Sequence, residues 1–221
     1  MTGMLKLYAH PFSSYCQKVL MALHENGTPF ELRQLDFDDT AMIEEWAALW
    51  PLRRMPVLRD GERAVMEATI IIEHLDRNHP GPVRFLPTAP DAALEVRMLD
   101  RVFDNYVMTP MQKIVFDRIR PADGRDPLGV ADAEALLDRS YRWLDGHLAG
   151  REWVAGDGFS LADCAAAPAL FYADWVRPID PAFAHLRAYR ARLLRRPSFA
   201  RAVEEARPYR GLFPGGAPDR D

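Results

Sequence analysis

Cysteines, lysines and long apolar runs are all scarce in this chain of 221 residues. The two cysteines, Cys16 and Cys164, lie far apart, which excludes a disulfide framework and a zinc site built from four cysteines. No apolar run approaches the roughly 18–20 residues that cross a membrane. The first residues, MTGMLKLYAHP, lack the basic and apolar regions of a signal peptide. We therefore expect a cytoplasmic protein without a membrane segment.

The charge balance excludes another class of protein. The chain has 28 basic and 32 acidic residues and a net charge of −4, whereas a nucleic-acid-binding protein normally carries a basic stripe. We therefore expect no nucleic-acid partner. The six histidines show no spacing typical of metal ligands, so we expect no metal site either.

Strand and helix patterns alternate over the first 80 residues. MLKLYA (4–9) and FELRQLDF (30–37) are typical of strands, and Asp60-Gly61 predicts a hairpin after Met55-Pro-Val-Leu58. Helices are predicted between and after these strands, from Cys16 to Asn26-Gly27, over 40–50, and from Glu67 to about Arg77. A crossover through a helix implies parallel pairing and a hairpin implies antiparallel pairing, so we predict a mixed, four-stranded sheet.

The second half of the chain contains only helical patterns. HPGPVRFLPTAP (79–90) has four prolines and is the natural linker between two domains. Ser160 and Asp163 have the spacing of a helix cap. Amphipathic helices are predicted over four segments: 91–118, 130–148, 160–175 and 182–205. The sequence therefore predicts an α/β domain over 1–79, a linker over 80–90 and an all-α domain over 91–221.

Several motifs in this order resemble those of the cytosolic glutathione transferases, over nearly the whole chain. The motifs are Ser13-Ser-Tyr-Cys-Gln-Lys-Val-Leu, Met55-Pro-Val-Leu, Glu67-Ala-Thr-Ile-Ile-Ile-Glu-His-Leu, Gly158-Phe-Ser-Leu-Ala-Asp163 and Arg196-Pro-Ser-Phe. The chain is most similar to the bacterial, serine-type members. The resemblance implies a thioredoxin-like domain followed by a helical bundle, usually assembled as a homodimer. It also implies a detoxifying enzyme that uses glutathione as co-substrate and needs no cofactor.

The first helix carries the candidate catalytic group. A thiol with a pKa near ~8.5 is little ionised at neutral pH, and a hydroxyl donor at a helix N-terminus favours the thiolate. By the resemblance, Ser13 is this donor. Ser14 and Gln17 have the spacing of a capping box, which would leave Ser13 free for the ligand. Ser14 and Tyr15 are alternative donors.

Cys16 has two interpretations. It corresponds to the second cysteine of a CxxC motif whose first position is Ser13, and without that partner the pair cannot exchange disulfides. It also lies on the apolar face of the predicted helix with Val19 and Leu20, which favours a role in core packing. We expect Cys164 to pack in the same way.

The resemblance implies a binding surface for glutathione on three further segments. Pro56 would be in the cis form and would present the backbone of Val57 as an edge for the cysteinyl part of glutathione. Glu67 would bind the γ-glutamyl ammonium. Ala68 replaces a serine that is common in the family, and Thr69 is the candidate to compensate for the missing hydroxyl. The implied glutathione-binding residues are Ser14, Arg54, Met55, Pro56, Val57, Glu67, Ala68 and Thr69, with Arg53 as an alternative to Arg54.

An apolar pocket for the second substrate is expected between the domains. Its candidate lining residues are Phe12, Phe103, Tyr106 and Met111, with Val107, Phe171, Tyr172 and Trp175 as further candidates. We interpret Asp100, Arg101 and Asp104 as surface charges, although they could instead reach the ligand of a partner subunit.

Two other functions remain open at this stage. A glutathione-dependent isomerase is a close alternative, although such relatives often carry Ser-Ser-Cys where this chain has Tyr15 as the third residue. A non-enzymatic interaction module on the same fold is the other alternative. Ala68 favours it, and the presence of Ser13, Pro56 and Glu67 opposes it.

Overall fold

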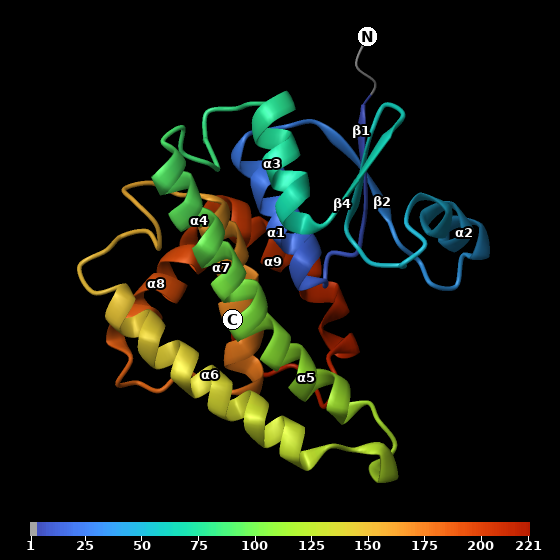
Figure 1. Ribbon diagram of the computed structural model, residues 1–221. Coiled ribbons are helices and arrows are strands. Elements are labelled where there is room, and N and C mark those ends of the chain that lie inside the picture. The colour runs from blue at the N-terminus through green and yellow to red at the C-terminus, as the bar shows by residue number, and fades with distance from the viewer. Residues whose placement is uncertain (1–3) are drawn as a thin grey trace.

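The N-terminal part of the chain forms a mixed sheet covered by helices on both faces (Figure 1). The computed structural model describes residues 4–221, so residues 1–3 of the predicted first domain lie outside the described residues. The elements of this part are β1 (Leu5–Ala9), α1 (Ser14–Glu25), β2 (Phe30–Gln34), α2 (Thr40–Leu49), β3 (Val57–Asp60), β4 (Arg63–Met66) and α3 (Ala68–Asn78).

The sheet has the mixed topology that the sequence predicts, in the order β2-β1-β3-β4. Strand β1 pairs with β2 in parallel and with β3 antiparallel, and β3 pairs with β4 antiparallel. Asp60 pairs with Arg63, so the hairpin turns through Gly61 and Glu62, and Gly61 has a φ of 59°. This is a thioredoxin-like arrangement, as expected.

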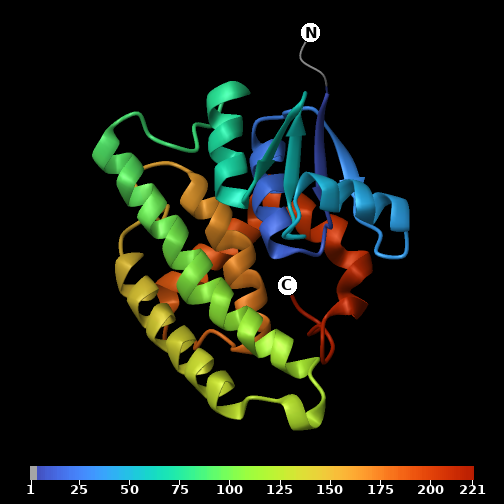
Figure 2. The ribbon, with the colours of Figure 1, turned by 45° about the vertical axis from the view of Figure 1, so that its right-hand side comes forward.

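The alternation of side chains along the strands divides the core into two layers. Leu5, Leu7 and Ala9 of β1 are buried in the core that includes α1 and α3. Tyr8 of β1 points to the opposite face, where it packs with Trp46 of α2. Figure 2 shows α2 on the outer side of the sheet, with α1 and α3 on the side of the helical domain.

The remainder of the chain is helical. Its elements are α4 (Pro90–Val102), the π-helical segment η1 (Phe103–Met108), α5 (Thr109–Arg118), the 3-10 turn η2 (Ala122–Gly124), α6 (Pro127–His147), α7 (Leu161–Val176), α8 (Ala184–Arg195), α9 (Pro197–Ala206) and the 3-10 helix η3 (Arg207–Leu212). The predicted segment 91–118 is one continuous helical rod that contains a π-helical insert. The predicted segment 182–205 is two helices, because Arg196 is extended before Pro197.

Helix α7 lies at the centre of the helical domain and connects its core to the first domain. Nearly all of its side chains are buried, and it packs against α1 and α4. Its cap agrees with the prediction, because the Asp163 carboxylate accepts hydrogen bonds from the Ser160 backbone N–H at 2.8 Å and from the Tyr189 hydroxyl at 2.6 Å. One continuous apolar core therefore extends from the sheet through α1 into the helical bundle.

Within residues 4–221, no helix combines the length and the apolar character needed to cross a bilayer.

Candidate functional site

The start of α1 differs from the predicted capping arrangement. Ser13, and not Ser14, is the N-cap residue, because the backbone N–H of Gln17 donates to the carbonyl of Ser13 at 2.9 Å and closes the first turn there. Ser14 is therefore inside the helix and largely buried. The Gln17 side chain donates to the Pro11 carbonyl at 3.0 Å and the Tyr172 hydroxyl at 3.1 Å. The predicted capping box of Ser14 and Gln17 is thus wrong.

Ser13 presents a partly exposed hydroxyl at this helix end. It has extended backbone angles, and its side chain makes no capping hydrogen bond. The unpaired N–H groups of the first helical turn lie beside it. An anionic group bound at this helix end can therefore interact with both the Ser13 hydroxyl and the positive end of the helix dipole.

Cys16 lies beneath this helix end and is fully buried, as the packing interpretation predicts. Burial raises the pKa of its thiol to about 12, and the Ser13 hydroxyl acts in the opposite direction. Burial also raises the pKa of the Cys164 thiol well above its ordinary value. Neither thiol is thus available as a nucleophile near neutral pH.

A cavity of about 490 Å³ opens in front of Ser13. Its walls come from the start of α1, the loop that precedes β3, the turn that precedes α3, and the segment from α4 to α5. The predicted residues that line it are Ser13, Arg54, Met55, Pro56, Glu67 and Ala68, together with Arg53 and Tyr15. The Met55–Pro56 peptide bond is cis, as predicted.

Three charged side chains of this cavity have no ionic partner in the described part of the chain. Arg53, Arg54 and Glu67 are exposed and form no ion pair within residues 4–221. Among residues 4–221, Arg53 and Glu67 are also the two residues other than glycine that have a positive φ. Their φ angles are 49° and 70°. Each such conformation costs about 1–3 kcal/mol and is typical of functional sites. The cavity thus combines two free cations and one free anion with a strained backbone.

Val57 does not provide the predicted backbone edge. It pairs with Tyr8 of β1 and with Met66 of β4, so it lies inside the sheet, and its side chain is fully buried. Met55 lies outside the strand and lines the cavity. Of these two residues, only Met55 borders the cavity.

Thr69 is also not free for a ligand. Its hydroxyl accepts from the Lys18 ammonium at 2.9 Å and from Arg101 at 2.6 Å, and it donates to Asp100 at 2.9 Å. It does not line the cavity. The predicted compensation for the missing hydroxyl of Ala68 is therefore wrong.

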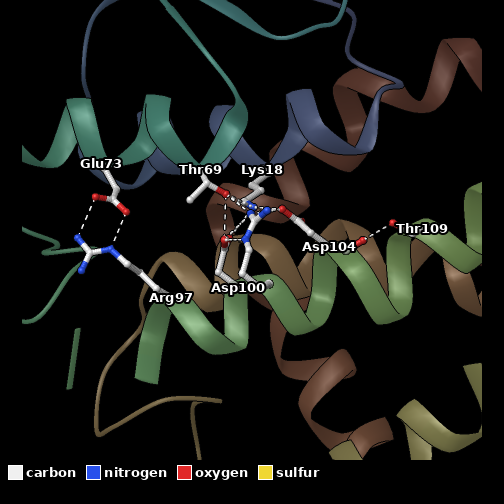
Figure 3. Close-up of polar contacts among 8 residues, drawn as sticks. Lys18, Thr69, Glu73, Arg97, Asp100, Asp104 and Thr109 are labelled. Atoms are coloured by element: carbon white, nitrogen blue, oxygen red, sulfur yellow. Dashed lines mark hydrogen bonds and ion pairs between the residues drawn. The ribbon is translucent and has the colours of Figure 1, made fainter. Parts of the chain in front are cut away.

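These contacts belong to a buried network that joins the two halves of the protein (Figure 3). Lys18 of α1 is 1% exposed and contacts Asp100 at 2.5 Å and Asp104 at 3.0 Å. Arg101 contacts the same two carboxylates at 2.6 and 2.5 Å. Asp100 is fully buried and Asp104 nearly so, so their interpretation as surface charges is wrong.

The network also shapes the electrostatics of the cavity. Arg101 and Asp104 line the cavity beside Tyr15. Burial raises the pKa of the Asp104 carboxyl, and Lys18 counteracts this shift. Burial and the charge of Asp104 raise the pKa of the Tyr15 hydroxyl well above its ordinary range. Tyr15 is thus a weaker acid than an exposed tyrosine.

A second, more apolar cavity of about 300 Å³ adjoins the first. Both cavities are lined by Ser13, Gln112 and Phe116. The predicted residues Phe12, Met111 and Tyr172 line the second cavity, and so does Ser14. The structure adds residues that the sequence did not indicate: Val115 and Ile119 of α5, and the segment Leu212, Phe213 and Pro214.

Other predicted pocket residues lie elsewhere. Phe103 is fully buried in the core. Tyr106 is half exposed and lies in a different surface hollow, with Trp143. Tyr106 lies within the π-helical insert, which changes the helical register between 103 and 108. Phe171 and Trp175 pack behind Tyr172 and are not in the cavity wall.

Comparison with known proteins identifies the family. The profile of the glutathione S-transferase N-terminal domain matches residues 7–83, and that of the C-terminal domain matches residues 107–197. Glutathione S-transferase 3 of Zea mays is 30% identical over 90% of this chain and 93% of its own length. The chain belongs to the glutathione S-transferase family. The fold and the enzyme class of the transferase are therefore those that its sequence motifs implied.

Other relatives of the transferase carry different names. A probable maleylacetoacetate isomerase of Vibrio cholerae is 29% identical over 92% of this chain and 97% of its own length. A stringent starvation protein A homolog of Coxiella burnetii is 24% identical over 76% of each chain. A glutathione S-transferase of Methylobacterium radiotolerans, solved in complex with glutathione sulfonate, superposes with a TM-score of 0.78 at 29% identity, over 91% of this chain and 95% of its own.

Proposed function

We propose that the protein conjugates glutathione to a hydrophobic electrophile, with the Ser13 hydroxyl stabilising the glutathione thiolate. The observation that carries this proposal is the position of Ser13, which lines both the polar cavity and the apolar cavity. A thiolate held by Ser13 would face an electrophile bound in the second cavity. The serine does not attack; the sulfur of glutathione does.

The charges of the first cavity support glutathione as the ligand. Glutathione carries two carboxylates and one ammonium group at neutral pH. The cavity offers two guanidinium groups, Arg53 and Arg54, and one carboxylate, Glu67, all without ionic partners within residues 4–221. The N–H groups at the start of α3, next to Glu67 and Ala68, can receive the γ-glutamyl carboxylate. We infer that Met55 pairs with the cysteinyl backbone.

The apolar character of the second cavity supports a hydrophobic second substrate. Phe12, Met111, Val115 and Phe213 contribute its apolar walls. The pocket contains no charged side chain among the residues that line it. A flat apolar molecule with one electrophilic carbon would fit this surface, and the reacting carbon would lie beside Ser13.

The test combines retention and turnover. We expect the protein to bind immobilised glutathione and to conjugate glutathione to chlorodinitrobenzene. Ser13→Ala is expected to lower kcat by about 100-fold, because loss of one positioned donor to a developing anion has an effect of this size. Retention on the resin should persist in this variant. The pKa of the bound thiol, measured from the ultraviolet absorbance of the thiolate, should rise toward that of free glutathione.

Ser14→Ala and Tyr15→Phe are matched controls that remove neighbouring hydroxyls. Both should leave kcat nearly unchanged. Turnover that is insensitive to Ser13→Ala but lost in Ser14→Ala or Tyr15→Phe would assign the donor role to that residue. Retention without conjugation, but with isomerisation of maleylacetoacetate, would favour the isomerase that one relative's name suggests. Neither retention nor turnover would favour an interaction module.

We also propose that the protein acts in the cytoplasm as a homodimer. Two free, buried cysteines are consistent with a reducing compartment. An apolar surface, formed by Leu94 and Met98 of α4, Tyr106 of η1 and Trp143 of α6, supports self-association, because each of these side chains is at least 44% exposed.

Light scattering on a sizing column tests the dimer. Met98→Glu should convert a dimer to a monomer, because it introduces a charge into this apolar surface. Leu128→Glu is the matched control, since Leu128 is 79% exposed and lies at the start of α6, outside the surface. A monomeric wild type, or a dimer that persists in Met98→Glu, would contradict the assignment.

A further inference from the structure

A cluster of two histidines and one aspartate lies outside the glutathione site. The Oδ2 atom of Asp60 is 2.8 Å from Nε2 of His74 and 2.7 Å from Nε2 of His79. Asp60 is the last residue of β3, His74 belongs to α3, and His79 directly follows α3. The sequence did not reveal this group, because its members come from different elements and His79 lies beyond the helix.

The donor atoms of this cluster suit a transition-metal ion. One donor atom from each residue lies within 4.8 Å of the others. Two imidazole nitrogens and one carboxylate oxygen are ligands that zinc prefers. In a tetrahedral zinc site, metal–ligand distances of about 2.0–2.1 Å place neighbouring ligand atoms about 3.3 Å apart. The two Asp60–nitrogen distances would thus each lengthen by about half an ångström, and the two nitrogens, which lie within 4.8 Å of each other, would adopt a similar separation.

The surroundings favour a site that a metal ion can enter. The side chain of His74 is 7% exposed, whereas those of Asp60 and His79 are 17% and 21% exposed, so solvent reaches one side. Within residues 4–221, Asp60 has no lysine or arginine partner that would compete with a cation. The side-chain amide of Asn78 contacts Nδ1 of His74 at 3.0 Å and holds the ring with Nε2 directed at Asp60.

We propose that Asp60, His74 and His79 bind a zinc ion, with water as the fourth ligand. Each neutral histidine would coordinate the metal through Nε2, and its ring proton would move to Nδ1. In His74 the Asn78 amide nitrogen, which also donates to the His74 carbonyl at 2.9 Å, would turn away from Nδ1 to make room for that proton. Both cysteines are buried elsewhere, so the site uses no thiolate.

The bound ion would connect the end of β3 with the end of α3. The residues that precede the starts of these two elements line the glutathione cavity. Pro56 directly precedes β3 and Glu67 directly precedes α3, and both line that cavity. The hairpin tip and the end of α3 lie at the opposite end of the domain, at the top of Figures 1 and 2. The zinc ion would thus link α3 to the sheet and stabilise its position there.

Calorimetric titration of the chelator-treated protein with zinc chloride tests the proposal. We expect one zinc ion per chain and a Tm that rises by several degrees on saturation. Cobalt(II) should give the intense visible absorption of a tetrahedral site. His79→Ala is expected to weaken zinc binding at least 10-fold. Asp60→Asn, which preserves the size of the side chain, should do the same.

His185→Ala is the matched control, because His185 is an exposed histidine outside the cluster. It should bind zinc as the wild type does. Circular dichroism verifies that each variant is folded without metal. Absence of zinc binding by the wild type at micromolar concentration would overturn the proposal. Binding that survives both His79→Ala and Asp60→Asn would overturn it as well. Conjugation activity is not the readout, so failure here leaves the glutathione proposal unaffected.

Discussion

Replacement of Lys18 by methionine removes one of two cations from the buried network between the domains. In the wild type, Lys18 and Arg101 balance Asp100 and Asp104, so the network is neutral. The variant leaves a net charge of −1 around a carboxylate that is fully buried. Removal of one partner from a buried ion pair typically destabilises a protein by about 3–5 kcal/mol. That loss is a large share of the roughly 5–15 kcal/mol that holds a protein folded.

Urea unfolding followed by circular dichroism measures the effect. We expect Lys18→Met to lower the free energy of unfolding by about 3–5 kcal/mol and Tm by about 6–20 °C. Lys6→Met is the matched control. The Lys6 side chain is 42% exposed and lies 3.6 Å from Glu31, and such surface pairs contribute about 0–1 kcal/mol.

A second substitution tests whether the uncompensated charge is the cause. Asp104→Asn in the Lys18→Met background leaves Arg101 and Asp100 as a neutral pair, so it should recover a substantial part of the lost stability. If Lys18→Met costs less than about 1 kcal/mol, or the double variant is no more stable than the single one, the electrostatic reasoning is refuted.

The pH dependence gives a further check. Burial raises the pKa of Asp104 in the folded protein, and removal of Lys18 would raise it more. A carboxyl whose pKa is raised on folding contributes most stability below its unfolded pKa, and this contribution is lost as the pH rises through the folded pKa. The stability deficit of Lys18→Met should therefore be greater at pH 8 than at pH 5. An equal deficit at both pH values would contradict this mechanism.

Three further predictions concern the cavities and the thiols. Ala68→Ser should lower the KM for glutathione about fivefold, because a new hydrogen bond contributes about 1 kcal/mol. Met111→Ala should lower kcat/KM for an apolar electrophile about tenfold through lost contact area, with the KM for glutathione unchanged. Cys16 and Cys164 should not react with Ellman's reagent at pH 8 until urea unfolds the protein, because both are buried and protonated. Rapid labelling of the native protein would contradict the last prediction.

The local patterns predicted the elements well. The strand at 4–9, the Asn26-Gly27 helix end and the Ser160–Asp163 cap appear as expected, because each depends on neighbouring residues. The division at 80–90 remains a prediction, although α3 ends at Asn78 and α4 begins at Pro90. The π-helical insert was not predicted, because its register depends on packing around Phe103 and Val107.

The candidate site was harder to predict where it depends on distant partners. Ser14 and Gln17 have the spacing of a cap, but Gln17 bonds to Tyr172 in the other domain, 155 residues away. Asp100 and Asp104 were interpreted as surface charges, because no sequence pattern brings Lys18 to them. Both errors have the same physical origin: polar side chains were assigned to local partners or solvent, whereas the fold pairs them across the interface between the domains.

The π-helical segment from Phe103 to Met108 allows one helical rod to serve two purposes. Residues of α4 before it pack on the buried network, and Met111, Val115 and Phe116 after it line the cavities. Each residue added to or removed from a helix rotates the rest of that helix by about 100°. Mutations in α5 can therefore change the apolar wall without disturbing Asp100, whereas deletion of one residue within 103–108 would turn that wall away from Ser13. The rod thus separates a part that holds the buried network from a part whose apolar side chains can change independently of that network.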